Sequence, residues 1–430
     1  MADEHLLHRI HGLGDLDLAA LLCLVSREHC IISTEPGELD TLTEELRLVA
    51  TQTFHLQPVV VDCTPHTTLD DLAASIQLPS PKPPSQSLSP GALGTPRSSS
   101  SVSPLRRRGT EGSSYFHHSR HGSYGNSNNA FTPTIGTATT QPRIANVILA
   151  RNLDRAPKDV QIQCLELLRT RRILTRTSVQ TAPKQFLFVA VLESANGASG
   201  TGLVSHLNDF FYVSHWHDPE DGFVHLEDEE EDAEEQGGRD SYGRDGGETA
   251  SLDSASSVVR RSIVELPSPR IDRGRSVHGM QGDGTAYDGS SSISTTPVSV
   301  SESDIASLAQ LARQINLDIE VLRYQMNIVS FLRMHRAVAP GGGSVTPLAT
   351  KHFTQLAKCL AAVHGLDYVT PSLIGLAAKK IYPHRLQIVT PEQERSMQWG
   401  SSRTAVEALL ESVGPEDVIE DVLAEVMAPL

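Results

Sequence analysis

Short apolar runs alternate with amphipathic segments in two parts of the chain. In residues 1–78, strand-like runs at 29–33 and 56–63 stand among helical patterns at 16–28, 40–54 and 68–76. In residues 143–217, strand-like runs at 144–150 and 184–194 flank a helical pattern at 157–173, and a shorter apolar run follows at 202–216. Continuously apolar strands between amphipathic helices are typical of a parallel sheet with both faces covered. The pattern predicts one α/β domain in two sequence pieces.

A third part of the chain, residues 303–387, is helical throughout by its pattern. The sequence Ser-Glu-Ser-Asp at 301–304 predicts a helix start, and a long helix is expected at 321–338. After a Gly-Gly-Gly break, Thr-Pro pairs open two further helices at 346–365 and 370–381. A weaker helical pattern from 404 to about 427 predicts a tail that can detach from the rest.

Two stretches contain too few apolar residues to form a core. One is rich in Ser and Pro; the other is acidic and rich in Gly and Ser, with a carboxylate run at 227–235. Ordering a residue costs roughly 1–2 kcal/mol of backbone entropy, which such stretches cannot offset, so we expect disorder. The predicted organisation is α/β domain 1–78, insert 79–142, α/β domain 143–218, insert 219–302, all-α domain 303–388 and tail 389–430.

Composition narrows the class of protein. With 5% aromatic residues and a formal net charge of −16, we expect neither general nucleic-acid binding nor membrane-surface binding. The five cysteines are scattered without Cys-x-x-Cys spacing, which favours a reducing compartment over a disulfide framework or a structural zinc site. No segment approaches the ~20 apolar residues of a membrane span. We expect a soluble protein in the cytoplasm, with the nucleus as the alternative.

The most specific string is NVILARNLDRAPKDVQIQCLELL at 146–168. It resembles the Walker B region of the MoxR and magnesium-chelatase branch of AAA+ ATPases, with Arg155, Ala156, Pro157, Gln161, Leu165 and Glu166 in register. The segment GLDYVTPSLIGLAAKKIYPHRL is similar to the closing helices of the lid in that branch, through Tyr368, Val369, Thr370, Pro371, His384 and Arg385. The resemblance covers about 240 residues in three ordered pieces. It implies an AAA+-like α/β domain followed by an all-α lid.

The same resemblance places a phosphate loop at STEPGELDTL, residues 33–42. In that register Thr34 stands for the first glycine, Gly37 keeps its place, Leu39 occupies the second glycine, Asp40 the lysine and Thr41 the magnesium-ligating hydroxyl. Backbone N–H groups and a lysine normally hold the phosphates. A unit charge about 4 Å from a phosphate oxygen contributes roughly 4 kcal/mol at an effective dielectric near 20, so reversing its sign changes the balance by roughly 8 kcal/mol. This exceeds the helix dipole's contribution of about 1 kcal/mol.

The other catalytic positions change in the same direction. The Walker B aspartate corresponds to Arg151 and the catalytic glutamate to Asn152, and neither can be a carboxylate ligand or a general base. The sensor after the next strand corresponds to Ser194, the finger arginine to Asp209 and the sensor arginine of the lid to Leu348. No Gly-Lys-Ser/Thr occurs anywhere in the chain. We expect no catalytic residue at these positions and no cofactor.

Several features also have plain structural interpretations. Asp40 or Thr41 can cap the following helix, and Arg155 can be a surface residue or form a salt bridge. His215, His217 and Asp218 lie close in sequence, but nothing completes a ligand set and we expect no metal site. The carboxylate run is usually solvated, with docking of a basic partner as the alternative. Phosphorylation in a regulated eukaryotic protein is suggested by Ser80, Ser89, Thr95, Ser103, Ser262, Ser268, Ser276 and Thr296.

These observations favour a pseudo-ATPase. We expect a non-hydrolysing scaffold or assembly partner that binds other proteins, among which AAA+ subunits of a mixed ring are candidates. The alternative is an ATPase subunit of the magnesium-chelatase type, which would use ATP and Mg²⁺ to insert a metal or remodel a partner. The residue types at 40, 151 and 152 discriminate between the two.

Overall fold

The computed structural model describes residues 4–78, 143–174, 179–194, 200–229, 298–339 and 345–429. The predicted insert 79–142 lies outside these ranges, and so do residues 230–297 of the second predicted insert and every candidate phosphorylation site.

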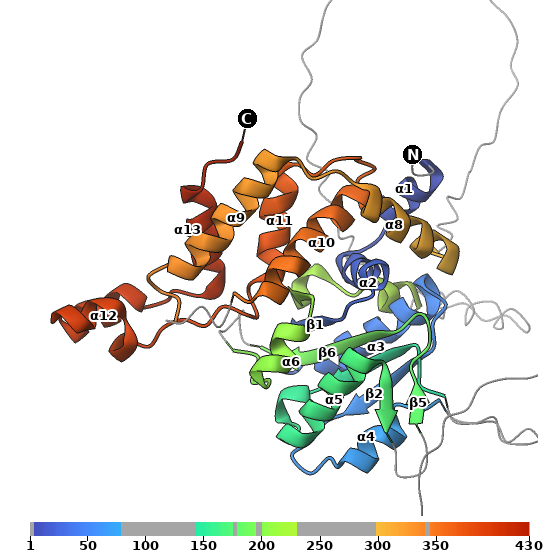
Figure 1. Ribbon diagram of the computed structural model, residues 1–430. Coiled ribbons are helices and arrows are strands. Elements are labelled where there is room, and N and C mark those ends of the chain that lie inside the picture. The colour runs from blue at the N-terminus through green and yellow to red at the C-terminus, as the bar shows by residue number, and fades with distance from the viewer. Residues whose placement is uncertain are drawn as a thin grey trace, which may run out of the picture.

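Five parallel strands form the central sheet (Figure 1). They are β1 (Cys30–Thr34), β2 (Pro58–Asp62), β3 (Val147–Arg151), β6 (Leu187–Glu193) and β7 (Val213–Trp216), in the spatial order β2-β3-β6-β1-β7. Because all neighbouring pairs are parallel, the carboxyl ends of the strands share one edge of the sheet. Ligands of open α/β sheets bind outside that edge.

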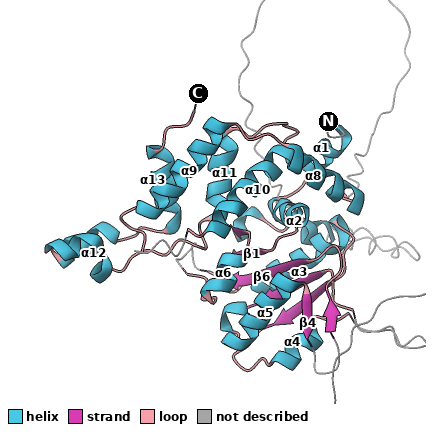
Figure 2. Cartoon of the chain, viewed as in Figure 1, coloured by secondary structure: helices cyan, strands magenta, loops and turns pink. Residues whose placement is uncertain are grey.

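Helices cover both faces of the sheet, as Figure 2 shows. Alternate residues of the strands point to opposite faces: Ile31 packs with α4 (Leu69–Ser75), α5 (Lys158–Thr170) and α6 (Ser205–Phe210), whereas Cys30 and Ile32 pack toward α2 (Asp15–Ser26) and α3 (Leu39–Leu48). A π-helical turn, Val49–Thr53, extends α3. Burial on both faces explains why the strands are apolar at every position.

An all-α domain follows the sheet and packs on the side of α2. It contains α8 (Glu302–Gln314), α9 (Ile319–Met334), α10 (Pro347–Val363) and α11 (Pro371–Ile381). Their starts are capped as the sequence predicts: the side chains of Ser301, Thr346 and Thr370 accept backbone N–H groups, and proline occupies the first turn of α10 and α11. The predicted fold class, a helix-flanked parallel sheet followed by an all-α domain, is confirmed.

Structure extends beyond several predicted boundaries. An additional helix α1 (Glu4–His11) precedes α2, and β4 (Arg172–Leu174) pairs with β5 (Val179–Thr181) in an antiparallel ribbon. Residues 219–229, placed in the second insert by their composition, are ordered and include a 3₁₀ turn at Pro219–Asp221. The carboxylate of Glu45 accepts the backbone N–H groups of His225 and Leu226 at 3.1 and 3.0 Å, which holds this segment against α3.

The C-terminal segment is part of the all-α domain. After 3₁₀ turns at Pro391–Gln393 and Arg395–Trp399, α12 (Arg403–Leu410) projects from the molecule and α13 (Pro415–Glu425) packs beside α9 and α11 (Figure 1). Val418, Ile419 and Val422 of α13 are each at most 1% exposed. Residues 415–425 therefore form part of the core and are not the detached tail that their weak helical pattern suggested.

Candidate functional site

The predicted phosphate loop connects β1 to α3 at the carboxyl edge of the sheet. Thr34 is the last residue of β1 and is fully buried, and α3 begins at Leu39, whose side chain is 3% exposed in the core. Gly37 has φ +106°, a conformation that favours glycine, yet no atom lies within 4 Å of the place of a Cβ. Gly37 is thus required by backbone conformation and not by the close approach of another group.

The first turn of α3 carries Asp40 and Thr41. The Thr41 hydroxyl donates to the Glu38 carboxylate, with 3.1 Å between the oxygens, so it is engaged within its own loop. The Asp40 carboxylate is largely solvent-exposed and forms an ion pair with the guanidinium of Arg151. Arg151 is the last residue of β3, the position that the resemblance equates with the Walker B aspartate.

Arg151 bridges two carboxylates. One terminal nitrogen binds Asp40 and the other lies 3.0 Å from the carboxylate of Asp62, the last residue of β2 and the register partner of Arg151. Only 23% of the Arg151 side chain is exposed. Both terminal nitrogens, which are the groups that could bind a phosphate, are therefore already bound to protein carboxylates. We call Asp40, Arg151 and Asp62 the edge ion-pair network.

Asn152 and Ser194 occupy the neighbouring strand ends. Asn152 adopts a left-handed conformation with φ +51°, and its backbone N–H donates to the carbonyl of Val191 at 2.9 Å. An amide side chain has no basic group with which to activate water. The backbone N–H of Ser194 donates to the carbonyl of Thr34 at 2.9 Å, so the predicted sensor position lies directly beside the end of β1.

Asp209 joins the sheet domain to the all-α domain. Its carboxylate accepts the hydroxyl of Thr346 at 2.7 Å and lies 3.3 Å from Nε of Arg385. Arg385 is 2% exposed, also donates to the backbone carbonyls of Asp209 and Phe211, and contacts Nδ1 of His352 at 3.0 Å. Burial lowers the pKa of Arg385 to about 10, against the raising effect of Asp209. We call Asp209, Thr346 and Arg385 the domain clamp.

Leu348 lies two residues after Thr346 in the first turn of α10 and is partly buried. The structure thus brings the predicted finger position and the first turn of α10 together through Asp209 and Thr346. Leu348 is apolar and supplies no cation to this contact.

Sequence reasoning missed Asp62, Asp154 and Arg385 as candidate site residues. Asp154 follows β3 in a 3₁₀ turn, Leu153–Arg155, and lines a pocket of about 290 Å³ between the strand ends and helices α11 and α13. Burial raises the pKa of Asp154. Arg385 stands in the lid-like string but was given no role there, and no local pattern marks Asp62 or Asp154, because the partners of all three come from distant parts of the sequence. Arg155, for which the sequence left a surface position or a salt bridge open, pairs with Glu193 at 2.6 Å.

His215 lies near the end of β7, and His217 directly follows that strand. Nδ1 of His215 accepts from Lys380 of α11 at 2.9 Å, and burial, with the charge of Lys380, lowers the pKa of His215 to about 3. Burial also lowers the pKa of His217. In the described ranges, no group of three or more His, Cys, Asp or Glu side chains is arranged to hold a metal ion.

Comparison with known proteins agrees with this architecture. Residues 334–409 match the model of the AAA lid domain. The structure of a proposed ATPase from Cytophaga hutchinsonii superposes with a TM-score of 0.54 at 13% identity, covering 99% of this chain and 94% of that one. The chain has an AAA+ fold.

Two curated relatives are called "Maintenance of telomere capping protein 2". That of Kluyveromyces lactis is 28% identical over 92 residues, 21% of this chain and 34% of the relative. That of Lachancea thermotolerans is 27% identical over 115 residues, 26% of this chain and 40% of the relative. The matched regions thus span well under half the length of either relative. No helix in the described ranges has the length and apolar character to cross a membrane.

Proposed function

We propose that this AAA+ protein is a non-hydrolysing scaffold or assembly partner of the MoxR and magnesium-chelatase type. The observation that carries the proposal is the edge ion-pair network. A carboxylate stands where the resemblance expects the phosphate-binding lysine, a guanidinium stands where it expects the metal-binding carboxylate, and the two neutralise each other.

The network opposes nucleotide binding in two ways. A triphosphate approaching the first turn of α3 meets Asp40 and Asp62, whose two negative charges exceed the single positive charge of Arg151 and repel it. A magnesium ion approaching the end of β3 meets a cation, and freeing Arg151 for a phosphate would require breaking its pairs with Asp40 and Asp62. The helix N-terminus of α3 remains available, but its dipole contributes only about 1 kcal/mol.

The domain clamp supports the same conclusion. A nucleotide-driven motor must move its lid against its sheet, whereas here a buried guanidinium ties Asp209 of α6 to the end of α11. Asn208 adds a hydrogen bond from its amide to the carbonyl of His384 at 2.5 Å. Separating the domains would leave Arg385 without these partners, which is costly for a buried charge. A fixed arrangement of domains suits a protein that presents surfaces to partners.

Isothermal titration of the full chain with Mg-ATP tests the proposal. We expect no saturable heat and no ATP turnover above that of a buffer blank. The matched variant is Asp40→Lys combined with Arg151→Asp, which restores the charges of an active site while keeping an ion pair at the same place. Tight magnesium-dependent binding by the unmodified chain, weakened by a single substitution at Asp40, would refute the proposal.

An ATPase of the magnesium-chelatase type is the second candidate, favoured by Asp154. Its carboxyl group lines the pocket beside Ser194 and has a raised pKa, which are properties of a general base. Turnover that is abolished in Asp154→Asn but retained in Asp159→Asn, an exposed α5 carboxylate, would establish this candidate over the scaffold.

Partner and location follow as proposals. If the chain joins other AAA+ subunits in a mixed ring, light scattering after the proteins are mixed should give the mass of several chains. A lone scaffold should instead give the mass of a complex with one partner. The names of the two yeast relatives refer to telomere capping, and a nuclear location is the corresponding proposal, to be tested by imaging the tagged chain. Cytoplasmic signal alone would refute it.

A further inference from the structure

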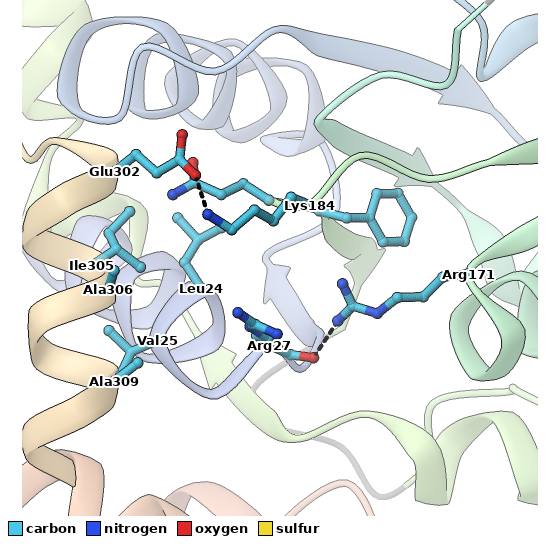
Figure 3. Close-up of a pocket in the computed structure, with 11 residues that line it drawn as sticks. Leu24, Val25, Arg27, Arg171, Lys184, Glu302, Ile305, Ala306 and Ala309 are labelled. Atoms are coloured by element: carbon cyan, nitrogen blue, oxygen red, sulfur yellow. Dashed lines mark hydrogen bonds and ion pairs between the residues drawn. The ribbon is translucent and has the colours of Figure 1, made fainter. Parts of the chain in front are cut away.

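A groove lies between one face of α8 and one face of α10, with the end of α2 as its floor. Its volume is about 510 Å³. A smaller neighbouring pocket, drawn in Figure 3, shares Val25, Arg27 and Ala309 with it, so the two are continuous. We call this surface the cationic groove, defined by Val25, Arg27, Ala309, Arg313, Lys351 and Lys358.

The cationic groove lies near the amino ends of the parallel strands, whereas the edge ion-pair network lies at their carboxyl ends. Arg27 lies three residues before β1 starts, and the smaller pocket includes Lys184, Gln185 and Phe186, which directly precede β6. These are the amino ends of parallel strands. The cationic groove is therefore separate from the predicted nucleotide site.

Positive charge collects in the groove with no close ion pair to offset it. In the described ranges, no carboxylate lies within ion-pair distance of Arg27, Arg313, Lys351 or Lys358. The whole chain has 52 acidic against 36 basic residues, so an unpaired group of four cations runs against its overall charge. Two acids are near. Glu302 pairs with Lys184 at 2.9 Å, and the charge of Lys351 lowers the pKa of the largely buried Glu28 against the larger raising effect of burial.

Two arginines meet here in unusual backbone conformations. Arg27 and Arg171 have φ of +59° and +56°, where a left-handed L-residue costs roughly 1–2 kcal/mol and glycine is usual. Figure 3 shows Arg171 reaching toward the loop of Arg27, whose carbonyl accepts from it at 2.8 Å. Burial, with the nearby charge of Arg27, lowers the pKa of Arg171. Both residues are C-caps, of α2 and α5, where a left-handed conformation is a common way to end a helix.

The charged and apolar residues that line the cationic groove indicate which kind of ligand it can bind. Helical spacing sets Arg313 on the same face of α8 as Ala309, and Lys351 on the same face of α10 as Lys358. Between these cationic walls the floor is apolar, with Val25 and Ala312 buried. Such an arrangement fits carboxylates at the rim and small apolar side chains in the centre.

We propose that the cationic groove binds an acidic peptide segment of a protein partner, with apolar side chains between its carboxylates. Nucleic acid fits less well, because bases stack on aromatic rings and the 510 Å³ groove has no aromatic side chain in its lining.

Fluorescence anisotropy of the full chain tests this assignment. The probes are a labelled 12-residue peptide of paired Glu and Leu residues, a 12-residue polyglutamate and a 12-nucleotide single-stranded DNA. The variant is Arg313→Glu with Lys351→Glu, and the control is Arg143→Glu with Lys158→Glu, which makes the same charge change at exposed cations outside the groove. Thermal melting checks that both variants remain folded.

We expect the Glu/Leu peptide to bind more tightly than polyglutamate or DNA. The groove variant should weaken that binding about tenfold, equivalent to about 1.4 kcal/mol, while the control changes it less than twofold. The weakening should diminish at high salt. Three results would overturn the proposal: no binding of the Glu/Leu peptide, equal weakening by both variants, or tightest binding of DNA.

Discussion

Replacing Asp209 with Asn removes the carboxylate that forms an ion pair with the buried Arg385 of the domain clamp, without changing side-chain size; Glu28 acts on Arg385 only from a greater distance. Removing a partner of a fully buried pair costs about 3–5 kcal/mol. Here the Asp209 side chain is 24% exposed, and Arg385 keeps backbone carbonyl partners. The amide oxygen of Asn can still accept from Thr346. We therefore expect a loss of about 2 kcal/mol in unfolding free energy.

Urea denaturation followed by circular dichroism measures this loss of unfolding free energy. In thermal melting, the same loss should lower the melting temperature by about 4–8 °C. The control is Glu407→Gln, which breaks an exposed pair with Arg403 at 2.7 Å and should leave the unfolding free energy nearly unchanged. If Asp209→Asn costs no more than the control, the domain clamp contributes nothing to holding the two domains together.

Further predictions concern the edge ion-pair network, Glu28 beside the cationic groove, the buried face of α13 and the loop that contains Gly37. Asp40→Arg and Arg151→Asp should be coupled by about 0.5 kcal/mol or more in a double-mutant cycle by thermal melting, since only the double change restores opposite charges at positions 40 and 151, and additive effects would contradict this. Burial raises the pKa of Glu28 from 4.5 to about 7, so the folded state favours its protonated form and stability is lost as the pH rises through this range. Glu28→Gln should remove up to about 3 kcal/mol of this pH-dependent loss. An unchanged pH dependence of the urea midpoint would contradict this. Ile419→Ala, at a side chain 1% exposed, should cost about 2–4 kcal/mol, whereas a detached tail would show no change. Gly37→Ala should cost about 1 kcal/mol through its positive φ alone, and a larger loss would mean that the loop is crowded.

Local pattern was sufficient for most elements of the fold. Continuous apolar runs predict the strands because both faces of the sheet are buried, and Thr-Pro pairs predict the starts of α10 and α11 because each threonine accepts a backbone N–H. The pattern failed where burial depends on a distant partner. The apolar face of α13 is short and acquires meaning only against α9 and α11, and residues 219–229 are held by the carboxylate of Glu45.

The sequence by itself determined which chemical groups stand at each position of the predicted nucleotide site, because the identities of Asp40, Arg151 and Asn152 do not depend on packing. Tertiary structure alone decided that Asp40 and Arg151, 111 residues apart, neutralise each other, and that Arg385 and Asp209, 176 residues apart, clamp the domains. It also decided that cations from α2, α8 and α10 face one groove. The physical reason is that ion pairing and burial depend on distances between side chains that the fold brings together, and no local spacing encodes those distances.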